Sequence, residues 1–194
     1  MRRLFYLASL ALMPMLAIAG DKATVLSGSA KFIVEEASTA TMEFDFSNAV
    51  VEEEKTIDEY LTGRGEDFVR DWPQVQSDVV DYTAVIFNKK NKNGMQIVNG
   101  GTVQYKIVVH VTAIDFGSTA SAIVNSVVGF GGPKKGGASM SGIIEVLDAS
   151  TNQSLCQVQI NNIKGMGTWT GETGRLKALM KPMTNKFLAA AKKS

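Results

Sequence analysis

Apolar and polar residues alternate along several stretches of the chain, and this period of two predicts β-strands. The clearest case lies between Val103 and Phe116, where Tyr105, Ile107 and Val109 share one face with apolar neighbours and Lys106 and His110 lie on the other. We expect this strand to have one buried and one polar face. The same pattern predicts two or three strands over Thr24 to Phe46, and single strands over Met95 to Val98, Ser139 to Leu147 and Ser154 to Ile163.

Two other segments change to the helical period. Val75, Val79, Tyr82 and Ile86 recur at helical spacing, and this predicts an amphipathic helix of about four turns with Pro73 in its first turn. A shorter helical piece is predicted over Ile57 to Trp72, broken at Gly63 and Gly65. The segment from Thr173 to Lys193 predicts a second amphipathic helix, which contains Pro182 and has a basic outer side.

These elements predict an α+β fold with one twisted, mainly antiparallel sheet packed on one side by two amphipathic helices. The chain has 194 residues, of which 45% are hydrophobic and 20% charged, and its mean hydropathy is +0.03. This composition is ordinary for one globular core and excludes a disordered chain, a collagen or a membrane bundle. We therefore expect a single domain over residues 20–194.

The first 19 residues have the three parts of a secretory signal peptide. Arg2 and Arg3 form a positive region, Leu4 to Ile18 is apolar, and Ala17 and Ala19 have the A-x-A spacing of a cleavage site. The alternative is a retained membrane anchor, but about 15 apolar residues are short for a spanning helix, which needs about 20. We predict cleavage near Ala19 and a periplasmic or secreted mature protein.

Charge is distributed unevenly, although the formal net charge is only +1. From Glu35 to Asp81 there are 14 acidic and 3 basic residues, and from Tyr82 to Ser194 there are 13 basic and 4 acidic residues. One interpretation is that the two parts lie together and neutralise each other. The other is that the basic face of the terminal helix contacts an anionic membrane surface or glycan. No nucleic-acid partner is expected, because the mature chain is nearly neutral and lacks a nucleic-acid motif.

The chain offers few residues for catalysis. His110 is the only histidine, so histidine-rich metal sites are excluded, and its polar neighbours place it on an exposed strand face. Cys156 is the only cysteine and alternates with Val158 and Ile160, which is typical of a small buried residue. The chain therefore cannot form an internal disulfide. We predict no enzymatic activity, no metal and no cofactor.

Four residues are candidate contacts for a ligand or partner. Trp169 lies beside glycines and could line a lipid or glycan site, or simply cover an edge of the core. Arg175, Lys177 and Lys181 begin the basic face of the terminal helix, which continues through Lys186 to Lys192 and Lys193. The glycines from Gly165 to Gly174 do not form a phosphate-binding loop, because no Gly-Lys-Ser/Thr sequence follows them.

The second half of the chain resembles a family of exported bacterial envelope proteins called domain of unknown function 4410. The resemblance covers about Gly101 to Ala190 and follows the strand from Tyr105 to Asp115, the Val128-Gly129-Phe130-Gly131 turn, and the strand and turn from Gly142 to Thr151. Asn152 stands where the family has a turn glycine, and the lipoprotein cysteine of many members is absent. The resemblance implies an exported α+β domain and supplies no catalytic residues.

These observations favour an exported, non-enzymatic interaction or assembly module of the cell envelope, with an envelope protein or a second copy as its partner. The alternative is a small periplasmic lipid- or glycan-binding protein with a cavity near Trp169 and the small-residue segment from Ser118 to Phe130, a segment that could instead enter a membrane. A third hypothesis is a hydrolase or redox enzyme that uses His110 or Cys156.

Cleavage of the signal peptide can be tested on the protein recovered from the envelope fraction of its host. We expect mass spectrometry to find an N-terminus at Gly20 or Asp21. Soluble envelope protein that still begins at Met1 would contradict this prediction.

Overall fold

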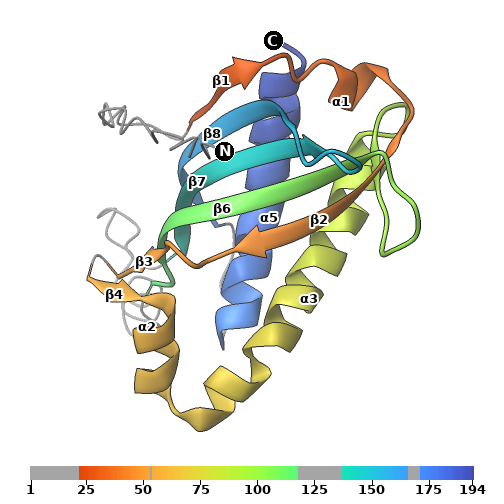
Figure 1. The fold of residues 1–194 in the computed structure, drawn as a ribbon. Helices are drawn as coiled ribbons and strands as arrows, with labels where there is room; N and C mark the ends of the chain where they lie inside the picture. Colours follow the sequence, from red (N-terminus) through yellow and green to blue (C-terminus); the bar gives the residue numbers. More distant parts are fainter. Residues whose placement is uncertain (1–21, 53, 118–136, 166–170) are drawn as a thin grey trace, which may run out of the picture.

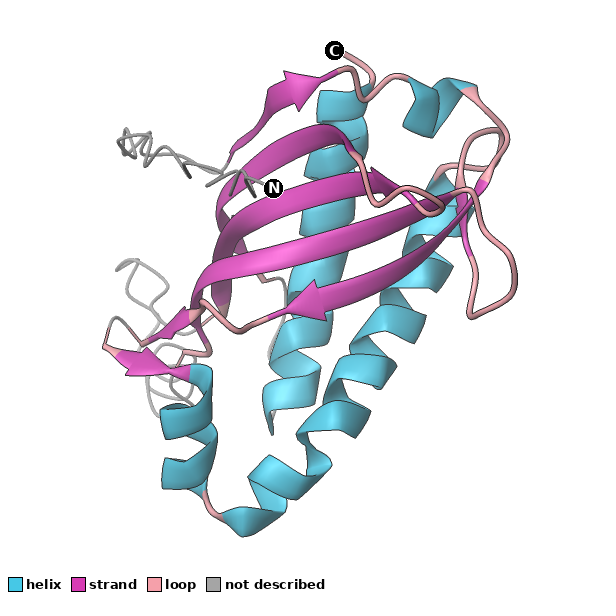
Figure 2. Cartoon of the chain, in the orientation of Figure 1, coloured by secondary structure: helices cyan, strands magenta, loops and turns pink. Residues whose placement is uncertain are grey.

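The computed structural model describes residues 22–52, 54–117, 137–165 and 171–194. They form one mixed sheet with helices packed against it (Figures 1 and 2). The described strands are β1 (Lys22–Gly28), β2 (Thr39–Asp45), β3 (Val50–Val51), β4 (Lys55–Thr56), β5 (Gln96–Ile97), β6 (Tyr105–Asp115), β7 (Ser139–Asp148) and β8 (Ser154–Lys164). The described helices are α1 (Phe32–Glu35), α2 (Ile57–Arg64), α3 (Glu66–Lys90) and α5 (Gly171–Ala191).

The predicted sheet topology and helix number were wrong, although the chain is an α+β fold. The strand order is β1-β8-β7-β6-β2-β5, and β2 runs parallel to both β5 and β6, while β3 also runs parallel to β6. Only the β1-β8-β7-β6 half and the small β3–β4 pair are antiparallel. The physical reason is that α2 and α3 lie between β2 and β6 in the chain. A helical crossover returns the chain to the same end of the sheet, so the next strand runs parallel.

Local sequence signals mark the start of α2 and the break between α2 and α3. Thr56 caps α2 by accepting from the backbone N–H of Glu59 at 3.2 Å, and the Glu59 carboxylate accepts from the backbone N–H of Thr56 at 2.8 Å. Gly65, at a φ of 115°, separates α2 from α3 and confirms the break predicted there, whereas Gly63, the other predicted break, lies inside α2. Pro73 lies inside α3 rather than in its first turn, so the predicted helix began too late.

The turn between β7 and β8 contains an asparagine with a left-handed backbone. Asn152 has a φ of 55°, in the left-handed region that asparagine tolerates better than most residues. Asp148 accepts hydrogen bonds from the backbone N–H groups of Ser150 and Thr151, both at 2.9 Å. The hydrogen bond from the Ser150 hydroxyl at 2.6 Å, followed by those from the backbone and side chain of Thr151, lowers the pKa of Asp148 to about 2.

The hydrophobic core lies between one face of the sheet and the layer of α3 and α5. Helix α5 packs on β1, β7 and β8, and α3 packs on β2 and β5 and along α5 (Figure 1). The rings of Phe87 on α3 and Phe187 on α5 lie 6.3 Å apart, and both side chains are 1% exposed. Pro182 lies within α5, which nevertheless continues from Gly171 to Ala191.

Removal of the Phe187 ring tests whether the helix layer holds the fold. We expect Phe187→Ala to lower the free energy of unfolding by about 3–5 kcal/mol, because it leaves a cavity in the core between α3 and α5. The control is Val85→Ala on the outer side of α3, where the side chain is 68% exposed and the expected change is within about 0.5 kcal/mol. Equal effects in urea denaturation would contradict this assignment of the core.

Candidate functional site

The face of the sheet opposite α3 and α5 is not covered by any helix in the described part of the chain (Figure 2). It carries a row of polar and charged side chains across four neighbouring strands. On β2 and β6 these are Thr41, Glu43, Asp45, Lys106 and His110, and on β7 and β8 they are Ser141, Glu145, Gln157, Gln159 and Asn161. The one-face alternation predicted from the sequence therefore places these side chains together.

His110 lies at the centre of this face between two carboxylates. Its Nδ1 is 2.9 Å from Asp45 Oδ2 on β2, and its Nε2 is 3.2 Å from Glu145 Oε2 on β7. Glu145 Oε1 also accepts from Ser154 Oγ at 2.6 Å and from Gln157 Nε2 at 2.8 Å. The network thus joins β2, β6, β7 and β8 through side chains.

The environment holds both carboxylates in their charged form. Hydrogen bonds from the side chain and backbone of Ser47, followed by that of His110, lower the pKa of Asp45 to about 2. Partial burial raises the pKa of Glu145, but the hydrogen bonds from Ser154, Gln157 and His110 outweigh it, so the pKa of Glu145 is lowered overall.

The geometry of the His110 network is that of a cross-strand tie. Both ring nitrogens already contact carboxylates, so neither is directed at a substrate. The three side chains bond to one another, and the described residues contain no group of three or more His, Cys, Asp or Glu placed to hold a metal ion. The role of His110 supported here is to join neighbouring strands.

Cys156 faces the opposite side of the sheet from His110, in the core. It is fully buried, and desolvation followed by the nearby Glu145 charge raises the pKa of its thiol to about 11. A thiol with this pKa is protonated at neutral pH and is a weak nucleophile.

Two of the three basic residues predicted as partner contacts instead form contacts within the protein. Arg175 donates from Nη1 to the carbonyl oxygens of Phe116, at 2.9 Å, and Gly117, where it holds the end of β6. Lys177 lies 3.6 Å from Asp78 on α3, which gives partial local neutralisation of the two charged segments. Lys181 is exposed and is not ion-paired with any described residue. Trp169 and the segment from Ser118 to Phe130 lie outside the described residues.

A buried carboxylate that sequence reasoning missed lies at the start of α5. Glu172 is 8% exposed and accepts from the hydroxyl of Tyr60 at 3.0 Å, while Arg64 lies 3.0 Å from the same carboxylate. Burial, followed by the Glu172 charge, raises the pKa of Tyr60. These three side chains tie α2 to α5. Their separation of more than a hundred residues left no signal in the sequence.

The strongest candidate for a binding surface is a cluster of lysines at the C-terminal ends of α3 and α5, which we call the basic end. Its six lysines are all exposed, and none forms an ion pair with a described residue. They are Lys31, Lys89, Lys90, Lys92, Lys192 and Lys193. The lysines meet there because Ala30 and Asn91 tie this end together: the backbone N–H of Ala30 donates to Ser194 Oγ at 3.0 Å, and Asn91 Nδ2 donates to the Ile33 carbonyl oxygen at 2.7 Å.

An open depression of about 270 Å³ lies at the basic end, between α3 and α5. Lys90 and Lys192 border it, and Asn185, Leu188 and Ala189 complete its lining. The predicted basic face of the terminal helix included Lys192 and Lys193. It missed the lysines near α1 and α3, because only packing brings those segments to the same end.

None of the helices in the described ranges is both long and apolar enough to cross a membrane. No family model and no curated protein matches the chain. The chain is similar to the PelC dodecamer from Paraburkholderia phytofirmans, with 10% identity over 86% of this chain and 97% of that chain and a TM-score of 0.44. A leucine-to-methionine variant of that PelC dodecamer gives 11% identity, coverage of 87% and 98%, and the same TM-score. A likeness at this TM-score says nothing about the function of this chain.

The Asp45 network predicts a stability change in acid. Because the folded-state pKa of Asp45 is about 2, below the ordinary value of 3.8, its charged form stabilises the fold above about pH 4. That contribution is lost as the pH falls from about 4 towards 2. We expect Asp45→Asn to be less stable than the unmodified protein at pH 7, and the difference to shrink across this interval in urea denaturation. Ser47→Ala, which removes a hydrogen bond that lowers this pKa, should move the loss to higher pH. A difference that does not change with pH would contradict the role assigned to Asp45.

Proposed function

We propose that this protein is an exported, non-enzymatic interaction module of the bacterial cell envelope, and that its basic end binds an acidic protein surface. The observation that carries the proposal is the gathering of six exposed, unpaired lysines from three separate segments at one end of the fold. The predicted signal peptide supports a location outside the cytoplasm.

Neutralisation of the partial negative charge at the two helix C-termini does not account for six lysines. The C-terminus of a helix carries a partial charge of about −0.5, so the ends of α3 and α5 together offer about one negative charge. Glu35 and Glu36 at the same end add two more. Six lysines exceed this requirement, and exposed like charges repel one another in the absence of a partner. An acidic surface would relieve that repulsion.

A second candidate is binding of an anionic lipid. Leu188 and Ala189 line the depression beside Lys90 and Lys192, which combines an apolar surface with cationic borders. The ends of two helices direct carbonyl oxygens toward this region, and this disfavours a small anion held deep between them. We therefore favour a protein surface whose carboxylates meet the tips of the lysine side chains.

Crosslinking from the depression tests the proposal. A photo-crosslinking amino acid at position 185, which is exposed, should give a discrete protein adduct in the envelope of the host. Reversing two bordering charges, Lys90→Glu with Lys192→Glu, should reduce the adduct about tenfold or more, because like charges would then face an acidic partner. The matched control is Lys22→Glu with Lys164→Glu, two exposed lysines on β1 and β8 that lie outside the basic end, which should leave the adduct unchanged.

Vesicle flotation separates the two candidate partners. The purified protein should not float with vesicles containing about a third phosphatidylglycerol any more than with pure phosphatidylcholine vesicles. A lysine-dependent flotation with the anionic vesicles would overturn the protein partner in favour of the lipid. An adduct at position 185 that is absent, or unaffected by the reversal, would overturn the proposed function.

A further inference from the structure

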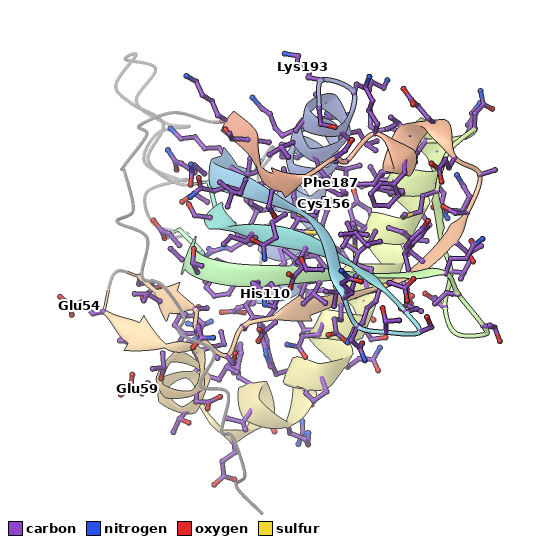
Figure 3. All side chains as sticks on the ribbon, turned by 45° about the horizontal axis from the view of Figure 1, so that its top comes forward. Glu54, Glu59, His110, Cys156, Phe187 and Lys193 are labelled. Carbon is purple, nitrogen blue, oxygen red and sulfur yellow. The ribbon has the colours of Figure 1, made fainter. Side chains whose placement is uncertain are left out.

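The opposite end of the molecule carries the complementary charge. Around α2 and the start of α3 the exposed carboxylates gather; we call this region the acidic end. It consists of Glu54, Asp58, Glu59, Glu66, Asp67 and Asp71. Figure 3 shows Glu54 and Glu59 on the far side of the molecule from Lys193.

Local ion pairs neutralise only part of the acidic end. Arg70 lies 2.8 Å from both Asp67 and Asp71, on the surface of α3. Arg64 is directed at the buried Glu172 instead. Asp58 and Glu66 are exposed and are not ion-paired with any described residue. The acidic end therefore keeps unpaired carboxylates, as the basic end keeps unpaired lysines.

Helix α3 separates the two ends. It has 25 residues, so at a rise of about 1.5 Å per residue its length is about 37 Å. At ordinary salt this distance exceeds the screening length of about 8–10 Å, so the two ends do not neutralise each other within one molecule. Each is available to a partner at the same time.

We propose that the acidic partner of the basic end is the acidic end of a second copy of this chain. This inference rests on the proposed function and names its partner. The contact would be heterologous, because one surface of the molecule meets a different surface of the next, and such a contact leaves a free end on each side that can bind further copies. Its ion pairs would bring Lys90 and Lys192 of one molecule against Asp58 and Glu66 of the next.

This contact can be tested by reversing the charges at each end of the molecule. Self-association of the purified mature protein is then measured by sedimentation velocity. The unmodified protein should self-associate, and association should weaken as salt is raised, because the contact is between exposed charges. The basic-end reversal, Lys90→Glu with Lys192→Glu, should weaken self-association about tenfold or more, and so should the acidic-end reversal, Asp58→Lys with Glu66→Lys.

Two further samples make the test independent of folding defects. A protein with all four substitutions should regain self-association to within about threefold of the unmodified protein, because the complementary charges are restored in exchanged positions. A mixture of the two reversed proteins should associate more strongly than either does alone. The control is again Lys22→Glu with Lys164→Glu, which should associate as the unmodified protein does.

The results separate this inference from the proposed function. An unmodified protein that stays monomeric at high micromolar concentration and low salt, or failure of the four-substitution protein to regain association, overturns the second copy as partner. If the adduct at position 185 still contains a different protein and depends on the lysines, the proposed function stands without this inference. Loss of both the adduct and self-association overturns both.

Discussion

The packing of α3 and α5 against a single face of the sheet is the constraint on which the rest of the structure depends. An amphipathic helix and a one-sided sheet must each bury their apolar surface, and the Phe87 and Phe187 rings lie where the two helices meet. This arrangement commits one sheet face to the core. It leaves the other face to polar side chains, and it brings the C-terminal ends of both helices together at one end of the molecule.

The two kinds of surface that result use charge differently. On the uncovered sheet face charges are paired with their neighbours, as Lys106 is with Glu43 at 2.8 Å and His110 is with two carboxylates. Such pairs reinforce the alignment of neighbouring strands. They also neutralise the charges of this face within the protein. At the ends of the helices many charges have no ion-pair partner among the described residues, as with Lys90 and Lys192 at the basic end and Asp58 and Glu66 at the acidic end. The proposed contact therefore lies at the ends and not on the sheet.

Secondary structure was predictable from the sequence wherever it depends on residues that are close together in the chain. The strand from Val103 to Phe116 corresponds to β6, the break at Gly65 separates α2 from α3, and the terminal helix was confirmed with Pro182 inside it. The direction of pairing was not predictable in this way, and the sheet is mixed because a helical crossover precedes β6. For the candidate site, the lysines of the terminal helix were recognised as a basic face, but Arg175 holds backbone carbonyls and Lys177 contacts Asp78.

The sequence by itself determined the apolar faces of the longer strands and helices, and that acidic and basic residues are concentrated in different parts of the chain. Periodicity and composition carry this information because they reflect interactions within a few residues. Only the tertiary structure decided that Lys31, Lys90 and Lys192 share one end and that Glu172 meets Tyr60 and Arg64 in the interior. Those contacts join residues about 60 to 160 positions apart, and they depend on how whole helices and strands cover one another's apolar faces.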